Sequence, residues 1–199
     1  MLKVTSTLSP CSAERRRAGQ DARQAFKTES ARTIRMAKGE FTVKEIGRVR
    51  SPYQEQTGTP IQPGFGEPLE AEVIIRTEFR EGLSDLERFG RIWLVSWFDR
   101  SKPCRMKVIP YRDTVERGLF ATRAPSRPNP VGISAVELLS VDAATGRLRV
   151  RGVDLLDDTP ILDIKPYVPE FDSHPNEATG WLDEGLSTHS ADDRFNRRD

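Results

Sequence analysis

Cysteine and histidine are scarce in this chain of 199 residues, which contains two of each. The usual zinc sites draw on several Cys or His side chains at short spacing, and a disulfide framework needs a larger set of cysteines. Both histidines, His174 and His189, lie in a polar C-terminal stretch, so a Ser-His-Asp triad or another histidine-based acid/base centre is not expected. We therefore predict a protein with no metal site and no disulfide framework.

Long apolar runs are also missing. The longest stretches, such as Ile92–Phe98, fall far below the roughly 20 residues that a membrane-spanning helix needs. The N-terminus lacks the apolar run of about 7–15 residues that marks a secretory signal peptide. The sequence thus predicts a cytoplasmic protein with no membrane partner.

Neither sign of charge is in excess, because 31 Lys and Arg face 30 Asp and Glu, for a formal net charge of +1. Attraction of a nucleic acid by bulk positive charge is therefore excluded, and any such binding requires a local basic patch. With 36% hydrophobic and 31% charged residues, the chain supports one domain of ordinary size with loosely ordered ends.

Composition divides the chain into three parts. Residues 1–39 are polar with three consecutive arginines (15–17), and we interpret them as a mobile basic arm with room for a short helix near 13–27. Its arginines either touch RNA or are solvated, and the second interpretation is favoured. Residues 40–172 are dense in strand and turn signals and form the predicted folded domain, and residues 173–199 form a polar, loosely ordered tail.

Six segments of the predicted domain have the β-branched, aromatic or alternating pattern of strands. They are Phe41–Val49, Leu69–Arg76, Arg91–Phe98, Val131–Val141, Arg147–Val153 and Ile161–Ile164. Ser84 and Glu87 have the spacing of a capping box, which predicts one short helix over residues 84–89. Fourteen prolines, nearly all near strand ends, favour a mainly all-β fold. We expect a small closed or strongly curved antiparallel barrel with long Pro-rich loops, not a doubly wound Rossmann-type sheet.

One predicted strand carries a stripe of basic residues. Arg147, Arg149 and Arg151 alternate with apolar residues, so their guanidinium groups share one face and the apolar side chains share the other. The basic face is either a solvated outer surface or a surface that contacts RNA. The first interpretation is favoured.

The segment 117–134 is a stiffened loop leading into a strand. It contains three arginines, three prolines in its loop part (Pro125, Pro128 and Pro130) and no acid. Fixed φ angles reduce the entropy that a loop loses on binding a ligand. Arginine in such a loop suits a phosphate, a carboxylate or a base plane. The alternative is a structural loop whose arginines pair with nearby Asp and Glu.

Two further loops are unusual in composition. Four aspartates lie within residues 154–163 at a spacing that does not match an EF-hand, and they either cap turns or bind a ribose hydroxyl or a cationic ligand. In loop 51–66, Pro60, Pro63 and Gly64 hold the backbone extended and expose its polar groups. This loop is no dinucleotide-binding fingerprint, because the third glycine and the following helix are missing.

Four segments carry a resemblance to a known family: "IGRVRSPY" (46–53), "PIQPGF" (60–65), "RGLFATRAPSRPNPVGIS" (117–134) and "DLLDDTPILDIKPYVP" (154–169). In order and spacing they resemble the motifs of the TsaA-like family, also known as YaeB or TrmO, which includes the VirR-type proteins. The resemblance covers residues 41–172. Because the segments are long and odd in composition, chance is a poor explanation.

The resemblance implies a small β-barrel that binds S-adenosylmethionine without a Rossmann fold and works as a homodimer. Characterised members methylate N6 of threonylcarbamoyladenosine at position 37 of tRNA, so the implied partner is the anticodon loop. The alternatives are a non-catalytic regulatory module that binds S-adenosylmethionine or RNA, and a methyltransferase of another substrate. By position, the resemblance assigns cofactor binding to Gln62, Pro63, Gly64, Asp99, Arg100, Arg123, Ser134, Asp154 and Leu155.

The implied reaction selects further residues. Its nucleophile is a urea-type nitrogen, which reacts only when its proton is removed or strongly polarised. The candidates for this catalytic help are Asp163, Lys165 and Tyr167. Arginine's planar fork fits a phosphate or the threonyl carboxylate. The candidates for substrate or RNA binding are Arg117, Arg127 and Asn129.

The chain departs from the family pattern in three places. Asp99 and Arg100 stand where the best-known bacterial members have His-Gln. Asp158 stands where the family's D-G-T-P turn has glycine, and we expect it to adopt a positive φ, which Asp tolerates better than most residues. The chain also ends before the small C-terminal domain of the longer members and adds the N-terminal arm.

Overall fold

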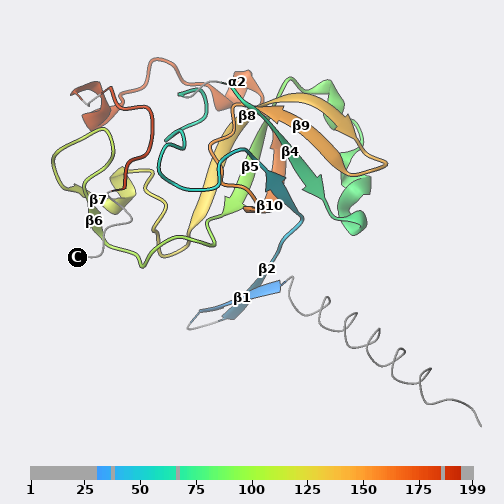
Figure 1. Ribbon diagram of the computed structural model, residues 1–199, viewed down its shortest axis with the longest axis horizontal. Helices are drawn as coiled ribbons and strands as arrows, with labels where there is room; N and C mark the ends of the chain where they lie inside the picture. The colour runs from blue at the N-terminus through green and yellow to red at the C-terminus, as the bar shows by residue number, and fades with distance from the viewer. Residues whose placement is uncertain (1–30, 37–38, 66–67, 185–186, 194–199) are drawn as a thin grey trace, which may run out of the picture. The chain divides into compact units, whose positions relative to one another are not determined.

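The computed structural model of the chain describes residues 31–36, 39–65, 68–184 and 187–193 (Figure 1). The chain divides into two compact units, residues 1–45 and residues 46–199. The short helix considered near residues 13–27 lies outside the described residues.

The described part of the first unit is a hairpin of β1 (Ala31–Met36) and β2 (Gly39–Lys44). The prediction of one strand over Phe41–Val49 was wrong, because β2 ends at Lys44 and β3 (Gly47–Arg50) belongs to the second unit. A change of pairing partner explains the break. β2 pairs with β1, whereas β3 pairs with strands of the second unit.

The second unit is built on a closed barrel in which all neighbouring strands are antiparallel. Around the barrel the order is β10 (Pro160–Pro166), β3, β4 (Glu70–Ile75), β9 (Arg147–Arg151), β8 (Val131–Asp142) and β5 (Arg91–Trp97). The predicted mainly all-β antiparallel barrel is therefore confirmed. Closure leaves no unpaired strand edge in the barrel.

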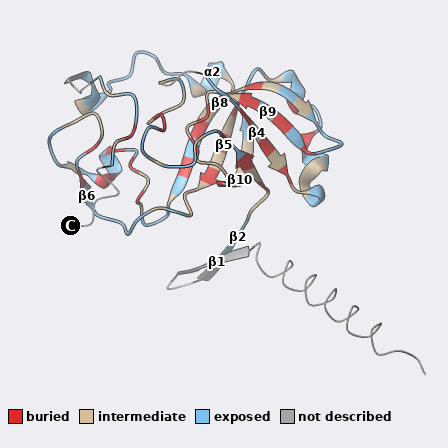
Figure 2. Ribbon diagram, in the orientation of Figure 1, coloured by how far each residue is buried: buried red, intermediate tan, exposed pale blue. Residues whose placement is uncertain are grey.

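Alternate residues of the barrel strands fill its interior. Ile92 and Leu94 on β5, Val136 on β8 and Leu148 and Val150 on β9 are fully buried, and Figure 2 shows this alternation as red bands along the strands. Burying one such side chain contributes about 1.5–3 kcal/mol to folding. This apolar cluster fixes which face of each strand points inward, and it thereby sets the direction of the polar residues that share a strand with it.

The outer face of β9 carries the predicted arginine stripe. Its guanidinium groups lie 2.5–3.3 Å from carboxylates of the neighbouring strands, because β9 lies between β4 and β8 in the sheet. The structure therefore favours the solvated outer face over an RNA-binding surface. We call the following pairs the β9 ladder: Arg147–Glu72, Arg149–Glu70, Arg151–Glu70 and Arg151–Glu137.

The helical segments are short, and the predicted capping box was wrong. Ser84 follows the 3-10 helix η1 (Thr77–Leu83), and its hydroxyl donates to the carbonyl of Glu81 at 2.9 Å. Because the preceding turn uses this hydroxyl, it does not cap the next one. Asp85, with φ +66°, leads instead into a second 3-10 turn, η2 (Leu86–Arg88).

Outside the barrel lies a small two-stranded sheet that sequence analysis missed. β6 (Lys107–Val108) pairs with β7 (Arg117–Gly118) at the left of Figure 1, and Val108, Leu119 and Ala124 form a separate apolar cluster. The remaining helical segments are η3 (Leu119–Ala121), α2 (Pro169–Asp172) and η4 (Gly180–Glu184). Among the described residues, no helix has the length and apolar character needed to cross a membrane.

Candidate functional site

Three loops that are distant in sequence meet near the start of β8. The guanidinium of Arg123 donates a hydrogen bond to the side-chain carbonyl of Gln62, and its positive charge acts on Asp154. Ser134 donates its hydroxyl proton to Oδ1 of Asp154 at 2.5 Å. We call Gln62, Arg123, Ser134 and Asp154 the polar cluster. The structure thus brings together four of the nine residues that the resemblance assigns to the cofactor.

Strand register determines the position of Ser134, and the turn at Gly152 determines that of Asp154. Ser134 is 2% exposed, because it shares the inward face of β8 with Val136. After β9, Gly152 has φ +80° and turns the chain. Val153 and Leu155 then enter the core, while the carboxyl of Asp154 meets Ser134.

The carboxyl of Asp154 titrates well above the ordinary range. Desolvation raises the pKa of Asp154 from 3.8 to about 6, since burial disfavours the charged form. The hydrogen bond from Ser134 and the charge of Arg123 lower this pKa without cancelling the rise. Perturbed carboxyl groups beside a specific charge are frequent at binding and catalytic sites. Asp154 can accept hydrogen bonds from a hydroxyl or an ammonium group placed beside it.

The turn at Asp158 is the one expected. Asp158 has φ +63°, and its carboxylate accepts a hydrogen bond from Arg48 at 2.7 Å. Arg48 also donates to the backbone carbonyl of Asp158 at 3.0 Å, which helps to hold this sparsely populated conformation. Asp157 links this turn to the end of β3, because its Oδ1 accepts the backbone N–H of Ser51 at 3.0 Å.

Asp99 and Arg100 lie at the end of β5, beside this turn. Arg100 donates to the carbonyl of Asp157 at 2.7 Å and to the hydroxyl of Thr159 at 3.0 Å. Its Nε lies 3.5 Å from the carboxylate of Asp99. Arg100 therefore fastens the end of β5 to the turn that follows Asp154, and the cofactor role of this pair stays a prediction.

The other residues assigned to the cofactor differ in exposure. Gly64 is exposed and has φ +85°, a conformation that favours glycine, while Pro63 is half-buried. Leu155 is 1% exposed and belongs to the barrel core. Leu155 thus supports the neighbouring Asp154 by packing.

Two of the three candidates for substrate binding lie on either side of η3. The guanidinium of Arg117 lies 2.7 Å from the carboxylate of Asp113 and 5.7 Å from the ring centre of Trp181. Asn129 is exposed on the proline-rich loop, and its backbone carbonyl accepts the N–H of Val131 at 2.8 Å. The side chain of Asn129 lies on the surface near the start of β8.

Arg127, the third candidate, braces its own loop. It donates to the carbonyl of Thr122 at 3.0 Å, and its guanidinium lies 5.6 Å from the ring centre of Phe120. Arg127 therefore agrees in part with the alternative interpretation, in which the loop is structural. It pairs with backbone carbonyls, however, and not with Asp or Glu. The stacked ring of Phe120 is 70% exposed.

The three catalytic candidates lie away from the polar cluster, on the outer face of the barrel. On β10, Asp163 and Lys165 stand opposite Val95 and Trp93, which alternate with the buried residues of β5. Lys165 Nζ lies 2.8 Å from the carboxylate of Asp163, and the ring of Tyr167 lies 5.4 Å from that of Trp93. The barrel wall therefore separates these side chains from the polar cluster of the same chain.

Comparison with known proteins identifies the family. Residues 48–173 match the family model described as the tRNA-methyltransferase O N-terminal domain. The chain belongs to this family. It is 47% identical over 143 residues to a probable S-adenosyl-L-methionine-binding protein of Pyrococcus abyssi, covering 72% of this chain and 77% of that protein. It is 34% identical to the tRNA (adenine(37)-N6)-methyltransferase of Escherichia coli, covering 71% of this chain and 63% of that enzyme.

Solved structures of TrmO share the fold. The crystal structure of TrmO from Pseudomonas aeruginosa superposes with a TM-score of 0.59 at 35% identity, covering 70% of this chain and 62% of that one. The chain therefore spans less than two thirds of the bacterial tRNA methyltransferase and of this TrmO structure. It matches 32% of the human tRNA (adenine(37)-N6)-methyltransferase, at 33% identity.

In this TrmO-family chain, sequence analysis missed a buried hydroxyl near the polar cluster. Ser96 on β5 is fully buried, and among the described side chains its Oγ is the buried polar atom that lacks a hydrogen-bond partner. Ser96 pairs with Gly132, two residues before Ser134 on the same face of β8. A side chain at position 132 would collide with Ser96 Oγ and the Phe98 ring. No sequence signal distinguishes Ser96 from an ordinary strand serine.

Residues 187–193 hold the loop that carries Gln62, which corrects the expectation of loose order for this stretch of the tail. The backbone of Ala191 exchanges hydrogen bonds with Gly58 and Thr59, each at 2.8 Å, and Ile61 donates to the carbonyl of His189 at 3.0 Å. The ring of His189 stacks on Phe65 at 4.9 Å. These contacts join residues more than 120 positions apart, so local patterns could not reveal them.

The same segment also braces the proline-rich loop. The indole N–H of Trp181 donates to the carbonyl of Ala121 at 2.8 Å, and Arg117 lies over its ring. The two loops that supply Gln62 and Arg123 to the polar cluster are therefore both fixed from outside, by Trp181, His189 and Ala191.

Proposed function

We propose that this protein transfers a methyl group from S-adenosylmethionine to N6 of threonylcarbamoyladenosine at position 37 of tRNA. Membership of the TrmO family and the similarity to the Escherichia coli and human tRNA methyltransferases support the proposal. The observation that carries it is the convergence of Gln62, Arg123, Ser134 and Asp154 from three loops and strand β8.

The chemistry of the polar cluster fits S-adenosylmethionine, which supplies a methyl group on a positively charged sulfur when bound. Arg123 offers a planar fork to the cofactor's carboxylate, and Gln62 holds that fork in place. Asp154 offers an acceptor to a ribose hydroxyl or to the amino group. The buried hydroxyl of Ser96, which has no hydrogen-bond partner among the described residues, offers a further polar contact in the barrel interior.

Methyl transfer also requires residues of the chain to remove or polarise the proton on the accepting nitrogen. Asp163, Lys165 and Tyr167 remain the proposed helpers. Because they lie on the outer face of the barrel, they can act only on a substrate that reaches that face. A second copy of the chain supplies a route, since its polar cluster can approach the outer face of the first.

A homodimer through the outer face of β5 and β8 is therefore part of the proposal. Val131 and Ile133 are 40% and 57% exposed and stand opposite Trp97 and Val95. Such an apolar strip on a solvent-facing sheet is typical of a protein interface. Substituting Ile133→Glu tests it, because light scattering should then report a monomer where the unchanged chain is a dimer.

Two measurements on the Asp154→Asn variant test the function. Titration calorimetry should report weaker S-adenosylmethionine binding than in the unchanged protein, whereas the control Glu72→Gln on the β9 ladder should bind normally. In the unchanged protein, a labelled-methyl assay should show transfer to tRNA that carries threonylcarbamoyladenosine and none to tRNA that lacks it, and Asp154→Asn should transfer less. Equal transfer to both tRNAs would overturn the assignment of the substrate.

A second candidate is a module that binds S-adenosylmethionine without turnover. The names of the archaeal relatives, which describe S-adenosylmethionine-binding proteins, favour it. The same pair of measurements separates the two functions. Cofactor binding that depends on Asp154, together with no methyl transfer to either tRNA, would support the module and overturn the enzyme.

A further inference from the structure

Residues 100–127, which we call the basic lobe, leave and rejoin the barrel at the candidate site. At one end Arg100 binds the turn at Asp157 and Thr159. At the other end Arg123 binds Gln62 and acts on Asp154. Any large ligand lying on this lobe is therefore adjacent to the polar cluster.

The basic lobe is strongly positive in a chain that is nearly neutral. Its formal charge is +6, against +1 for the whole chain. Its acids are Asp113 and Glu116, and its basic residues are Arg100, Lys102, Arg105, Lys107, Arg112, Arg117, Arg123 and Arg127. This local excess is the kind of patch that the overall charge balance requires for nucleic-acid binding.

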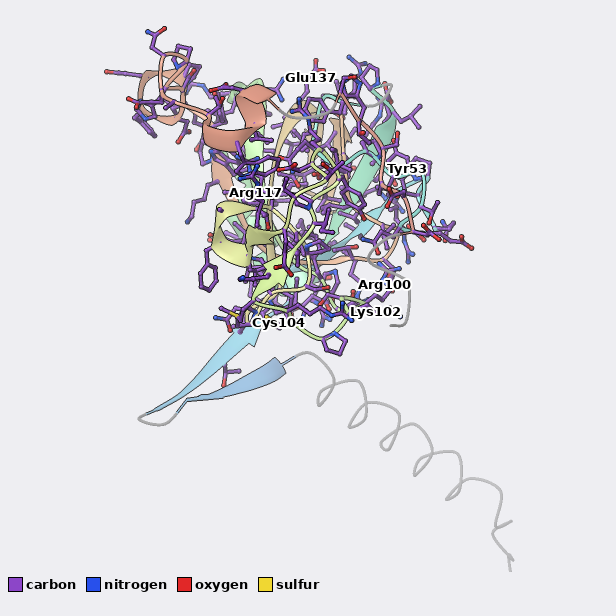
Figure 3. The ribbon with its side chains drawn as sticks, turned by 90° about the vertical axis from the view of Figure 1, so that its left-hand side faces the viewer. Tyr53, Arg100, Lys102, Cys104, Arg117 and Glu137 are labelled. Atoms are coloured by element: carbon purple, nitrogen blue, oxygen red, sulfur yellow. The ribbon has the colours of Figure 1, made fainter. Side chains whose placement is uncertain are left out.

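The two acids of the lobe are already paired within it. Asp113 lies 2.7 Å from Arg117, and Glu116 lies 3.7 Å from Lys107. The stretch from Lys102 to Lys107 is exposed at every residue. In Figure 3, Arg100 and Lys102 lie at the lower edge of the second unit, with Arg117 above them. The lobe thus presents a net positive surface to solvent.

The lobe also exposes flat and apolar side chains among its charges. Phe120 is 70% exposed, and Met106 is 57% exposed. The guanidinium of Arg127 lies over the ring of Phe120 at 5.6 Å from its centre, which places an aromatic ring beside a cation at the surface. Unpaired nucleobases of RNA loops stack on such rings and on guanidinium planes.

The lobe is held in place by its own contacts, so little conformational entropy is lost when a ligand binds to it. Its small sheet pairs Lys107 with Gly118, Val108 and Leu119 are buried in its own apolar cluster, and Leu119 donates its N–H to the carbonyl of Met106 at 2.9 Å. Trp181 binds it from outside. A surface organised in advance retains more of its contact energy as affinity.

From these observations we propose that the basic lobe is the surface on which tRNA docks. Phosphates lie along Lys102, Arg105 and Lys107, and an unpaired base stacks near Phe120. The proposal rests on the proposed function for the identity of the RNA. RNA fits better than an acidic protein, because an exposed ring beside an arginine matches bases as well as phosphates.

Two matched triple variants of the full chain test the docking surface, and each removes three positive charges. The lobe variant carries Lys102→Gln, Arg105→Gln and Lys107→Gln. The control carries Arg147→Gln, Arg149→Gln and Arg151→Gln on the β9 ladder. Filter binding of tRNA at several salt concentrations is the readout, and titration calorimetry with S-adenosylmethionine checks the polar cluster.

The lobe variant should bind tRNA roughly tenfold or more weakly than the unchanged protein near 0.1 M salt. The slope of log affinity against log salt should fall by about 2–3, since about one unit is lost per phosphate contact. The control should keep both values, and both variants should keep their cofactor affinity. Equal loss of tRNA affinity in the two variants, or none in the lobe variant, would overturn the docking surface.

Two further experiments distinguish RNA from other acidic polymers and docking from the reaction: a competition with polyglutamate and a methyl-transfer assay. Polyglutamate that displaces tRNA as well as unlabelled tRNA does would assign the lobe to acidic polymers in general and overturn the RNA assignment. Lobe-dependent tRNA binding without methyl transfer would support the docking surface while the proposed function fails. Methyl transfer that the lobe variant performs with unchanged KM for tRNA would overturn the docking surface while the function stands.

Discussion

The polar cluster and the β9 ladder both place carboxylates beside arginines, and the two carboxylates respond in opposite ways. In the ladder, hydrogen bonds from Arg149 and Arg151 hold the pKa of Glu70 below its ordinary value. In the cluster, burial raises the pKa of Asp154 although Arg123 acts on it. A carboxylate beside an arginine is thus a satisfied surface contact in one region and a partly desolvated group in the other.

The largest expected effect is on stability, because the raised pKa of Asp154 makes the free energy of unfolding depend on pH. Below its ordinary pKa near 4, Asp154 is protonated in both the folded and the unfolded state. Between pH 4 and 6 the folded state binds more protons than the unfolded state, so the free energy of unfolding falls as the pH rises through 6. Because burial raises this pKa from 3.8 to about 6, this loss is about 3 kcal/mol.

Asp154→Asn should remove that loss and leave the variant more stable than the unchanged protein above pH 6. Urea unfolding at pH 4, 5, 6 and 8 measures it. Parallel pH profiles for the two proteins would contradict the raised pKa. The variant should at the same time lose cofactor affinity, as expected where function and stability oppose each other.

The next largest effect is expected on cofactor affinity, when one arginine is removed from each region. Arg123→Ala should weaken S-adenosylmethionine binding about 10–100-fold, the usual effect of losing charge-assisted hydrogen bonds. Arg149→Ala, on the ladder, should change it less than about twofold, because Arg149 pairs with Glu70 and not with a member of the polar cluster. Calorimetry at one salt concentration measures both, and similar losses in the two variants would erase the distinction between the regions.

The bracing of the cluster loops predicts a smaller effect. Trp181→Phe keeps an aromatic ring under Arg117 and removes the N–H that binds the carbonyl of Ala121. The loop that carries Arg123 should loosen, raising the KM for the cofactor several-fold while kcat changes little. Because this hydrogen bond lies outside the barrel core, Trp181→Phe should leave urea unfolding nearly unchanged. A variant with unaltered KM would show that the brace does not position Arg123.

The smallest effect lies on the ladder itself. Glu70→Gln should lower Tm by less than about 4 °C, since exposed ion pairs contribute little. The lowered pKa of Glu70 means that its contribution is present above the ordinary pKa of 4.5 and disappears as the pH falls through the lowered value. Thermal melts at pH 7 and pH 3 check this. A larger loss at pH 3 than at pH 7 would contradict the sign of the shift.

Local patterns predicted most of the barrel, because its strands alternate inward and outward residues. The segments containing β4, β5, β8, β9 and β10 were found within a few residues of their observed ends. The errors fell where a long-range choice decides: the change of pairing partner after Lys44 and the use of Ser84 by the preceding turn. β6 and β7 have two residues each, too few for any periodicity.

The positions of the candidate site residues followed from the resemblance. The raised pKa of Asp154 and the directions of the side chains did not. Motif positions pointed to Gln62, Arg123, Ser134 and Asp154, which do meet. The raised pKa of Asp154 depends on burial, which no sequence window measures. For the same reason the outward direction of Asp163 and Lys165 emerged only from the register of β10 against β5, which includes an irregularity before Asp163.

A crystal structure of the chain with S-adenosylhomocysteine bound tests the central claim most directly. We expect one ligand molecule whose carboxylate lies on Arg123 and whose hydroxyl or amino group lies on Asp154, with residues 62–64 beside it. A ligand bound elsewhere, with the hydrogen bonds from Arg123 to Gln62 and from Ser134 to Asp154 undisturbed, would contradict the account.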